Sequence, residues 1–322
     1  MTFPTSSDQR PAASGAVASD PMLADAAPSA GDAGRLARGV DGHQSEWKRR
    51  WRRFRAYPPA VPALAFIILL VITAILAPVI APHEPLDNNL RLRGDGPSSG
   101  YWLGNDANGR DMLSRLLYGT RIALLVGIGA TTIAVTIGVL VGASSGYFGG
   151  WVDLVLSRLV DSLMAFPTIA LLLVLAAVLS PSIPLVVLII GFSVWASYAR
   201  VVRAEVLSLK QRDFVLAAEA SGATSWRIIV RHIIPNVVGV VIVLWSLAVG
   251  GVIIYESALS FLGLGVQPPN PSWGRMLADG RDYIREYPHI MIAPGIFITV
   301  TVLAFNLLGE GLRDAFDPRG RR

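Results

Sequence analysis

Apolar runs of about 20 residues recur along the chain and are separated by polar, proline-rich or glycine-rich segments. About 20 helical residues cross the roughly 30 Å hydrocarbon layer of a membrane, so each run has the length of one transmembrane helix. The pattern predicts six spans, at about residues 60–81, 121–141, 159–179, 183–198, 237–255 and 290–308. We therefore expect an all-α integral membrane protein whose six transmembrane helices form one domain over residues 60–322.

Two different segments precede the first span. Residues 1–44 are rich in Ala, Ser, Gly, Asp and Pro without apolar periodicity, which predicts a disordered tail. Residues 45–59 form a basic segment. Basic residues beside a span stay in the cytoplasm, and six spans return the chain to its starting side, so both termini are expected to be cytoplasmic. The first apolar run is too long for a signal peptide and lacks a small-residue cleavage site.

The connections between the spans differ in charge. Six basic residues follow the fourth span and precede the fifth: Arg200, Arg203, Lys210, Arg212, Arg227 and Arg231. Such density predicts a cytoplasmic loop. The two longer polar connections, at about residues 83–118 and 256–289, should then lie outside, and a glycine-rich turn at residues 145–151 joins the second span to the third.

Composition supports a membrane protein and narrows its partners. Hydrophobic residues make up 52% of the chain and charged residues only 16%, which is too apolar for a soluble domain. The net charge of +5 would suit nucleic acid, but the arginines cluster beside apolar runs and favour the anionic inner face of a lipid bilayer. We therefore expect no nucleic-acid partner. The chain has no cysteine, which rules out disulfides and thiolate metal sites.

An amphipathic stretch at residues 214–236 interrupts the apolar pattern between the fourth and fifth spans. It predicts two short helices separated at Gly222, because glycine suits the left-handed residue that ends a helix. Asp213 can cap the first helix, and Thr224 or Ser225 can cap the second.

The second of these helices carries its own apolar pattern. Trp226, Ile229, Val230 and Ile233 follow the spacing i, i+3, i+4 and i+7, which predicts one shared apolar face beside two arginines. Pro235 is expected to stop this helix and to open the next one, since proline is favoured in the first turn of a helix.

This stretch resembles the cytoplasmic loop of the membrane subunits of binding-protein-dependent ABC importers. That loop carries Glu-Ala-Ala, three residues, Gly, nine residues and then Ile-x-Leu-Pro. Here the register is Leu216-Ala217-Ala218, then Gly222, then His232-Ile233-Ile234-Pro235. The Gly and Pro spacing matches, whereas Leu216 replaces the glutamate, His232 replaces the isoleucine and the nearest acid is Glu219.

Other strings resemble the dipeptide, oligopeptide and nickel branch of these permeases: Leu103–Asp106, Gly109–Asp111, Ser114–Gly119, Gly146–Asp153, Glu256–Gly265, Gln267–Pro269, Pro271–Gly274 and Asn306–Asp314. The resemblance implies a bacterial inner-membrane subunit that forms half of a pore with a second, homologous permease. It also implies two cytoplasmic ATPase subunits, which would hold ATP and Mg²⁺, and an external solute-binding protein. No cofactor is expected on this chain itself.

The resemblance places ATPase coupling in a loop at about residues 204–235. The residues that it assigns to coupling are Leu216, Ala217, Ala218, Glu219, Gly222, Ala223, Trp226 and Pro235. The contact made by the family's glutamate does not transfer directly, because Leu216 stands in its place. Asp161 and Glu256 lie within or at the edge of spans, where an ionisable side chain marks either the transport route or a buried, paired position.

The leading hypothesis is ATP-driven uptake of a di- or oligopeptide, with nickel or another small solute of the same branch as the alternative. An autonomous secondary transporter would need intramembrane ionisable relays or broken helices near mid-span, which the sequence predicts to be sparse. We expect no ATP hydrolysis by this chain, because neither Lys48 nor Lys210 precedes the Ser or Thr that a phosphate-binding loop requires. The dispersed histidines form no zinc-protease motif.

Overall fold

The computed structural model describes residues 46–179 and 182–316, which form helices and loops without a β-strand. The tail predicted at residues 1–44 lies outside the described residues. The helices are α2 (Glu46–Ala56), α3 (Ala60–Ile80), η2 (Leu90–Leu92), α4 (Met112–Phe148), α5 (Gly150–Met164), α6 (Thr168–Val178), α7 (Ile183–Lys210), α8 (Asp213–Ala220), α9 (Ser225–Ile228), η3 (Ile229–Ile233), α10 (Ile234–Phe261), α11 (Trp273–Gly280), η4 (Arg281–Tyr283) and α12 (His289–Phe316). The chain divides into two units after Trp47, and the second unit is described below.

Within the described residues, five helices have the length and apolar composition to cross a membrane, namely α3, α4, α7, the continuous helix Ser225–Phe261 and α12. The pair α5 and α6 gives a sixth crossing only if both helices belong to one span, because they are bent by 82°. The all-α membrane fold is thus confirmed, but the single helix predicted at residues 159–179 is wrong. Pro167 accounts for the break, because proline lacks an N–H and disfavours a helical residue before it.

Several helices extend well beyond the predicted spans. α4 has 37 residues, which at 1.5 Å per residue makes it roughly 56 Å long, about twice the thickness of the hydrocarbon layer. α7 runs on to Lys210, so Arg200 and Arg203 lie on this helix rather than in a loop. The turn predicted at residues 145–151 is shorter in the structure. It is only the junction of α4 and α5, where Gly149 and Gly150 both have positive φ.

α4 and α7 pack closely along a row of glycines. A Cβ atom added at Gly142 would lie 2.5 Å from the Ala199 carbonyl oxygen, and one at Gly146 would lie 2.9 Å from that of Arg203. Both distances are too short for real contacts, so only glycine lets the two backbones approach this closely.

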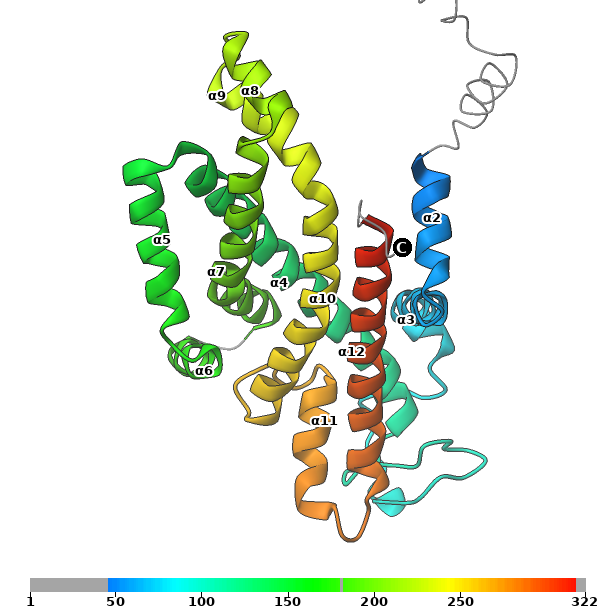
Figure 1. Ribbon diagram of the computed structural model, residues 1–322. Helices are drawn as coiled ribbons and strands as arrows, with labels where there is room; N and C mark the ends of the chain where they lie inside the picture. Colours follow the sequence, from blue (N-terminus) through cyan, green and yellow to red (C-terminus); the bar gives the residue numbers. More distant parts are fainter. Residues whose placement is uncertain (1–45, 180–181, 317–322) are drawn as a thin grey trace, which may run out of the picture. The chain divides into compact units, whose positions relative to one another are not determined.

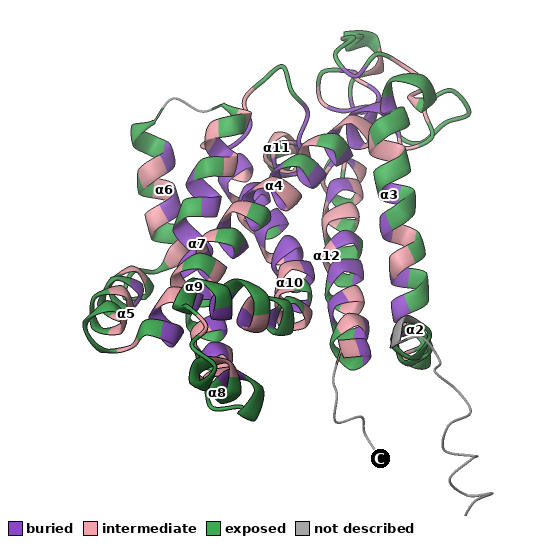
Figure 2. Cartoon of the chain, turned by 90° about the horizontal axis from the view of Figure 1, so that it is seen from above, coloured by how far each residue is buried: buried purple, intermediate pink, exposed green. Residues whose placement is uncertain are grey.

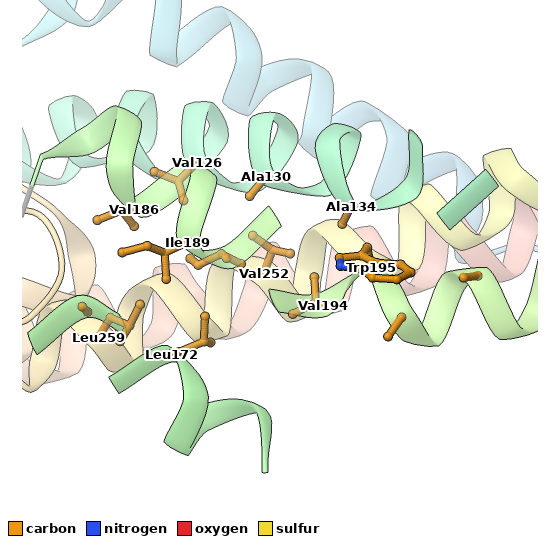
Figure 3. Close-up of a cluster of buried hydrophobic side chains, with 14 of the residues drawn as sticks. Val126, Ala130, Ala134, Leu172, Val186, Ile189, Val194, Trp195, Val252 and Leu259 are labelled. Carbon is orange, nitrogen blue, oxygen red and sulfur yellow. The ribbon is translucent and has the colours of Figure 1, made fainter. Parts of the chain in front are cut away.

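One hydrophobic core lies where α4, α5, α6, α7 and α10 meet (Figure 3). Its labelled side chains are Val126, Ala130 and Ala134 of α4, Leu172 of α6, Val186, Ile189, Val194 and Trp195 of α7, and Val252 and Leu259 of α10. Leu172 is almost completely buried, so α6 remains packed on the bundle in spite of the bend that precedes it.

Large apolar side chains also cover part of the outer surface. On α3, Leu69, Ile75 and Val79 are 58%, 69% and 80% exposed. Exposure of this much contiguous apolar surface is unfavourable in water and is expected of a helix that faces lipid.

The two ends of the bundle carry different elements (Figure 1). α8 and α9 lie at one end, together with the end of α12, and α2 packs there through Phe54 in a cluster that includes Ala315. α11 and the loop between α3 and α4 lie at the opposite end. The amphipathic loop and the two longer polar connections therefore lie at opposite ends of the bundle, as the alternation of spans predicts.

Candidate functional site

α8 ends in a turn built around Gly222. The Ala223 N–H donates to the Ala218 carbonyl oxygen at 3.1 Å, and the Gly222 N–H donates to that of Glu219 at 2.9 Å. This pair of bonds is the Schellman arrangement, which needs a left-handed residue, and Gly222 supplies it with φ of +76°. The predicted break at Gly222 is confirmed.

The starts of the two short helices agree only in part with the sequence-based prediction. Thr224 caps α9, since its side chain accepts from the Arg227 N–H, and this prediction is confirmed. Asp213 is not a cap. It is the first residue of α8, and Arg212 precedes it without any side-chain cap bond. An acidic side chain in the first turn still stabilises the helix by interacting with its dipole.

The helix that begins with α9 does not stop at Pro235. A π-helical segment, η3, connects α9 to α10, and the N–H of Ile234 donates to the carbonyl oxygen of Ile229. Proline inside an α-helix has no N–H to donate and clashes with the carbonyl four residues earlier. A wider π turn just before Pro235 accommodates both the missing N–H and the proline ring. The helix therefore continues from Ser225 to Phe261.

The π turn also changes which side chains share a face. Ile229 and Ile233 are buried with Ile228, whereas Trp226 is 74% and Val230 42% exposed. The single apolar face predicted from regular i, i+3, i+4 spacing is therefore wrong, because that spacing assumes 3.6 residues per turn and the π segment has a wider turn.

α8 is held on the bundle by its inward face. Val215 is fully buried and Ala218 is half-buried in a cluster that includes Tyr147 of α4. Lys210 Nζ donates to the Tyr147 carbonyl oxygen at 2.8 Å, and the Tyr147 hydroxyl donates to Glu219 Oε1 at 3.4 Å. The Lys210 bond joins α7 to α4 at Tyr147, and the Tyr147 side chain in turn contacts α8, so α8 has a defined orientation at the end of the bundle.

The outward face of α8 is open to solvent (Figure 2). Leu216 is 50% exposed, and Ala217, Glu219 and Gly222 are exposed as well. Together with half-buried Ala218 and Ala223, six of the eight residues assigned to coupling lie on α8 and its terminal turn: Leu216, Ala217, Ala218, Glu219, Gly222 and Ala223. The other two, Trp226 and Pro235, lie in a separate groove that contains no α8 residue.

The structure does not bring Asp161 and Glu256 together. On α5, Asp161 accepts from Arg200 Nη2 at 2.6 Å, both side chains are 54% exposed, and they line a cavity of about 380 Å³. Glu256 of α10 is fully buried, and it accepts from the Ser260 hydroxyl at 2.7 Å and from the Ser257 hydroxyl at 3.4 Å. Of these two acidic side chains, only Asp161 borders open space.

Arg203, which also lines this cavity, takes part in an ion pair that the sequence did not predict. Arg203 of α7 donates to both carboxylate oxygens of Asp153 on α5, at 2.6 and 2.7 Å. The hydroxyls of Ser145 and Ser157 donate to the same carboxylate. The sequence spacing could have indicated this polar site. Asp153, Ser157 and Asp161 recur every fourth residue and so form a polar stripe on an apolar helix.

A second unpredicted network lies at the opposite end. Arg115 near the start of α4 is 3% exposed and pairs with Asp106 and with Asp279 of α11. Arg110 donates to Asp106 at 2.7 Å. The network ties the loop between α3 and α4 to α11. Residues 46–179 and 182–316 contain no group of three His, Asp or Glu side chains arranged to hold a metal ion.

Comparison with known protein families gives two matches. Residues 134–322 match the family described as binding-protein-dependent transport system inner membrane component, and residues 45–97 match the N-terminal TM domain of oligopeptide transport permease C. The first match contains α8, the Gly222 turn and α9. It bears out the resemblance inferred from the sequence motifs.

Individual relatives are similar over most of their length. The dipeptide transport system permease protein DppC of Alkalihalophilus pseudofirmus is 38% identical over 85% of this chain and 90% of its own. The glutathione transport system permease protein GsiD of Pectobacterium atrosepticum is 41% identical over 86% and 92%. The oligopeptide transport system permease protein OppC of Haemophilus influenzae is 42% identical over 85% and 88%.

Proposed function

The chain belongs to the family of binding-protein-dependent transport system inner membrane components, and we propose that it is the permease subunit of an ATP-driven importer of di- or oligopeptides. The relatives are named for dipeptides, glutathione and oligopeptides, which share peptide chemistry. Each of these relatives aligns over about nine tenths of its length, so the comparison concerns the whole subunit. Nickel or another small solute is the alternative.

The observation that carries the coupling role is the exposed knob formed by α8 and the Gly222 turn. Its inner face is fixed by Val215 and the Tyr147 contacts, while Leu216, Ala217 and Gly222 face outward. A rigid, projecting surface of small and apolar side chains suits insertion into a cleft of another protein. We propose that the ATPase docks on this surface and that α7, which leads directly into α8, connects the docking site to the bundle.

The proposed assembly contains a second permease, two ATPase subunits and an external binding protein. ATP and Mg²⁺ are assigned to the ATPases, since a phosphate-binding loop needs a Lys followed by Ser or Thr, and Lys48 and Lys210 do not meet this requirement. We propose Asp161 as a residue of the transport route because it borders an open polar cavity. Glu256, which is fully buried among serines, is proposed to position the end of α10 instead.

Charge supports an orientation with α8 in the cytoplasm. Basic side chains at the end that carries α8 include Arg49, Arg212 and Arg227, and an excess of such residues marks the cytoplasmic side. Both termini are accordingly proposed to be cytoplasmic.

Single cysteines test this orientation, because the chain has no cysteine of its own. Ser99→Cys and Asn270→Cys are expected to react with a membrane-impermeant maleimide in intact cells, whereas Ser225→Cys should react only after lysis. All three positions are exposed, so differences in labelling report sidedness rather than burial. Labelling of Ser225→Cys from outside would reverse the topology.

Uptake by a deletion strain tests the proposed substrate. Loss of this chain should stop uptake of a labelled dipeptide or tetrapeptide and leave nickel uptake unchanged, and expression of the chain should restore it. Arsenate, which depletes ATP, should block the restored uptake, whereas a proton uncoupler should not when ATP is maintained. Normal peptide uptake with lost nickel uptake would favour the alternative substrate, and proton-dependent uptake would favour a secondary transporter.

A further inference from the structure

The cavity of about 380 Å³ between α4, α5 and α7 combines charged and apolar side chains. Its volume lies at the lower end of the range of about 300–1,000 Å³ that small-molecule sites occupy. The cavity therefore has the size and the chemistry of a site for a short, charged ligand. The side chains that matter for this ligand are Asp161, Arg200, Arg203, Val141, Val160 and Ala199.

Arg203 is firmly held in the wall of this cavity. Its guanidinium donates through Nε and Nη2 to the two carboxylate oxygens of Asp153, at 2.6 and 2.7 Å. The hydroxyls of Ser145 and Ser157 donate to the same carboxylate. Because four donors share this carboxylate, the pair of Arg203 and Asp153 fixes α5 to α4 and α7 and is not easily replaced by a ligand.

The pair formed by Asp161 and Arg200 is held much less firmly. A single hydrogen bond of 2.6 Å joins Arg200 Nη2 to Asp161 Oδ1, and both side chains are 54% exposed. An ion pair that is this accessible to water contributes little to stability. A ligand that brings one positive and one negative group can therefore separate the two side chains, and each of them then gains a new partner of opposite charge.

We propose that this cavity binds a short peptide by its two termini, with the α-ammonium group on Asp161 and the α-carboxylate on Arg200. The planar guanidinium of arginine suits a carboxylate because it can donate two parallel N–H bonds to it. Val141, Val160 and Ala199 then contact the peptide between its termini. The inference rests on the proposed function, and it gives Asp161 a role in recognising the substrate as well as in lining its route.

The same side chains disfavour a metal ion such as nickel. Nickel binds sites that are rich in imidazole and other nitrogen or oxygen donors. Among the described residues that line the cavity, Asp161 is the one acid and there is no histidine, while Arg200 and Arg203 would repel a cation. A free anion such as phosphate would suit Arg200 but would leave Asp161 without a partner. A zwitterion is the class of ligand that satisfies both side chains.

The test measures equilibrium binding to the assembled transporter, with this chain, its partner permease and the ATPases, in nanodiscs without the external binding protein and without ATP. The probes are radiolabelled dialanine, its N-acetyl form and its C-terminal amide. Each terminal charge that pairs with a side chain should contribute about tenfold in affinity, so each blocked peptide should bind the wild-type chain about tenfold more weakly than dialanine. In Asp161→Asn acetylation should no longer weaken binding, and in Arg200→Gln amidation should no longer do so.

A matched control changes another exposed ion pair. Arg281 and Asp282, which follow α11, are joined by a single bond of 3.1 Å and do not line the cavity. Arg281→Gln and Asp282→Asn should leave the binding of all three peptides unchanged.

Four results would overturn the proposal. The first two concern the wild-type chain, which could fail to bind dialanine saturably or could bind all three peptides equally, and they count even where a variant does not assemble. The third is an equal loss for all three peptides in Asp161→Asn and Arg200→Gln, which a purely structural ion pair predicts. The fourth is displacement of dialanine by inorganic phosphate as readily as by unlabelled dialanine, which would make the cavity an anion site.

These binding measurements need neither uptake nor ATP hydrolysis, so they separate the peptide site from the proposed function. A chain that restores peptide uptake to a deletion strain but binds the three peptides equally refutes the site alone. A chain that shows the expected tenfold differences but restores no peptide uptake refutes the proposed function alone.

Discussion

Replacing Gly222 with aspartate is expected to abolish peptide uptake while the chain still inserts into the membrane and pairs with its partner permease. Gly222 has φ of +76°, where a side chain costs on the order of 1 kcal/mol. A Cβ atom added there meets no other atom within 4 Å, so nothing inside the chain is displaced. An obstructed docking surface behaves like the loss of a binding hot spot, and uptake should fall at least about 30-fold.

The control for Gly222→Asp is Gly263→Asp. Gly263 also has positive φ, at +81°, an added Cβ atom likewise has open space around it, and the same pair of backbone hydrogen bonds ends its helix, but the residue follows α10 rather than α8. It should keep uptake near the wild-type level, and Leu216→Ala should have only a mild effect because the family's glutamate is already missing there. Uptake, peptide-stimulated ATP hydrolysis and co-purification of the ATPases are the measurements. Normal values of all three in Gly222→Asp would show that the knob does not couple the subunits.

Replacing Gly142 with leucine is expected to disrupt the fold itself. A Cβ atom at this position would lie 2.5 Å from the Ala199 carbonyl oxygen and 2.9 Å from Val202 Cβ, so α4 and α7 would have to separate. Overpacking of this kind costs about 3 kcal/mol, which is a large part of the 5–15 kcal/mol typical of folded proteins. We expect a lower thermal unfolding temperature in detergent and less chain in the membrane.

Gly251 provides the matched control for this prediction. It lies within α10, where an added Cβ atom has no neighbour within 4 Å. Gly251→Ala should be neutral or stabilising by up to about 1 kcal/mol, because alanine is the better helix former, whereas Gly142→Ala should destabilise. Equal unfolding temperatures for the two alanine variants would mean that the α4–α7 contact is looser than the structure shows.

Much of the fold follows from the sequence, because local composition decides whether a segment enters a membrane. The apolar runs that begin at Ala60, Val237 and Ile290 each became part of a spanning helix. The Gly222 turn and the Thr224 cap were also predictable, since each depends on the chemistry of one residue and its nearest neighbours. These features need no knowledge of how distant parts of the chain pack.

Other features depend on contacts that a linear pattern does not contain. The apolar run around Pro167 has the composition of one span, and only the packing of α6 on the core shows where the bend leads. The π turn before Pro235 changes the helical period locally, which is why the predicted shared face of Trp226 and Ile229 was wrong.

The candidate site shows the same division. The motif register identified Leu216, Ala217 and Gly222 as a group, and the structure places them together on one exposed surface. The sequence motif could not show that Arg203 pairs with Asp153, because these residues are 50 positions apart and meet only through the packing of α5 on α7. Nor could it separate Trp226 from the α8 surface, because sequence spacing alone does not show the orientation of the groove.

Site-specific photo-crosslinking at Ala217 tests the proposed docking of the ATPase most directly. A benzoylphenylalanine at this exposed position of α8, in membranes that contain the whole transporter, should form a light-dependent adduct with an ATPase subunit. The same probe at Ser99, at the opposite end of the bundle, should form none. Adducts of Ala217 with lipid or with the external binding protein, and none with an ATPase, would contradict the assignment of α8 as the coupling element.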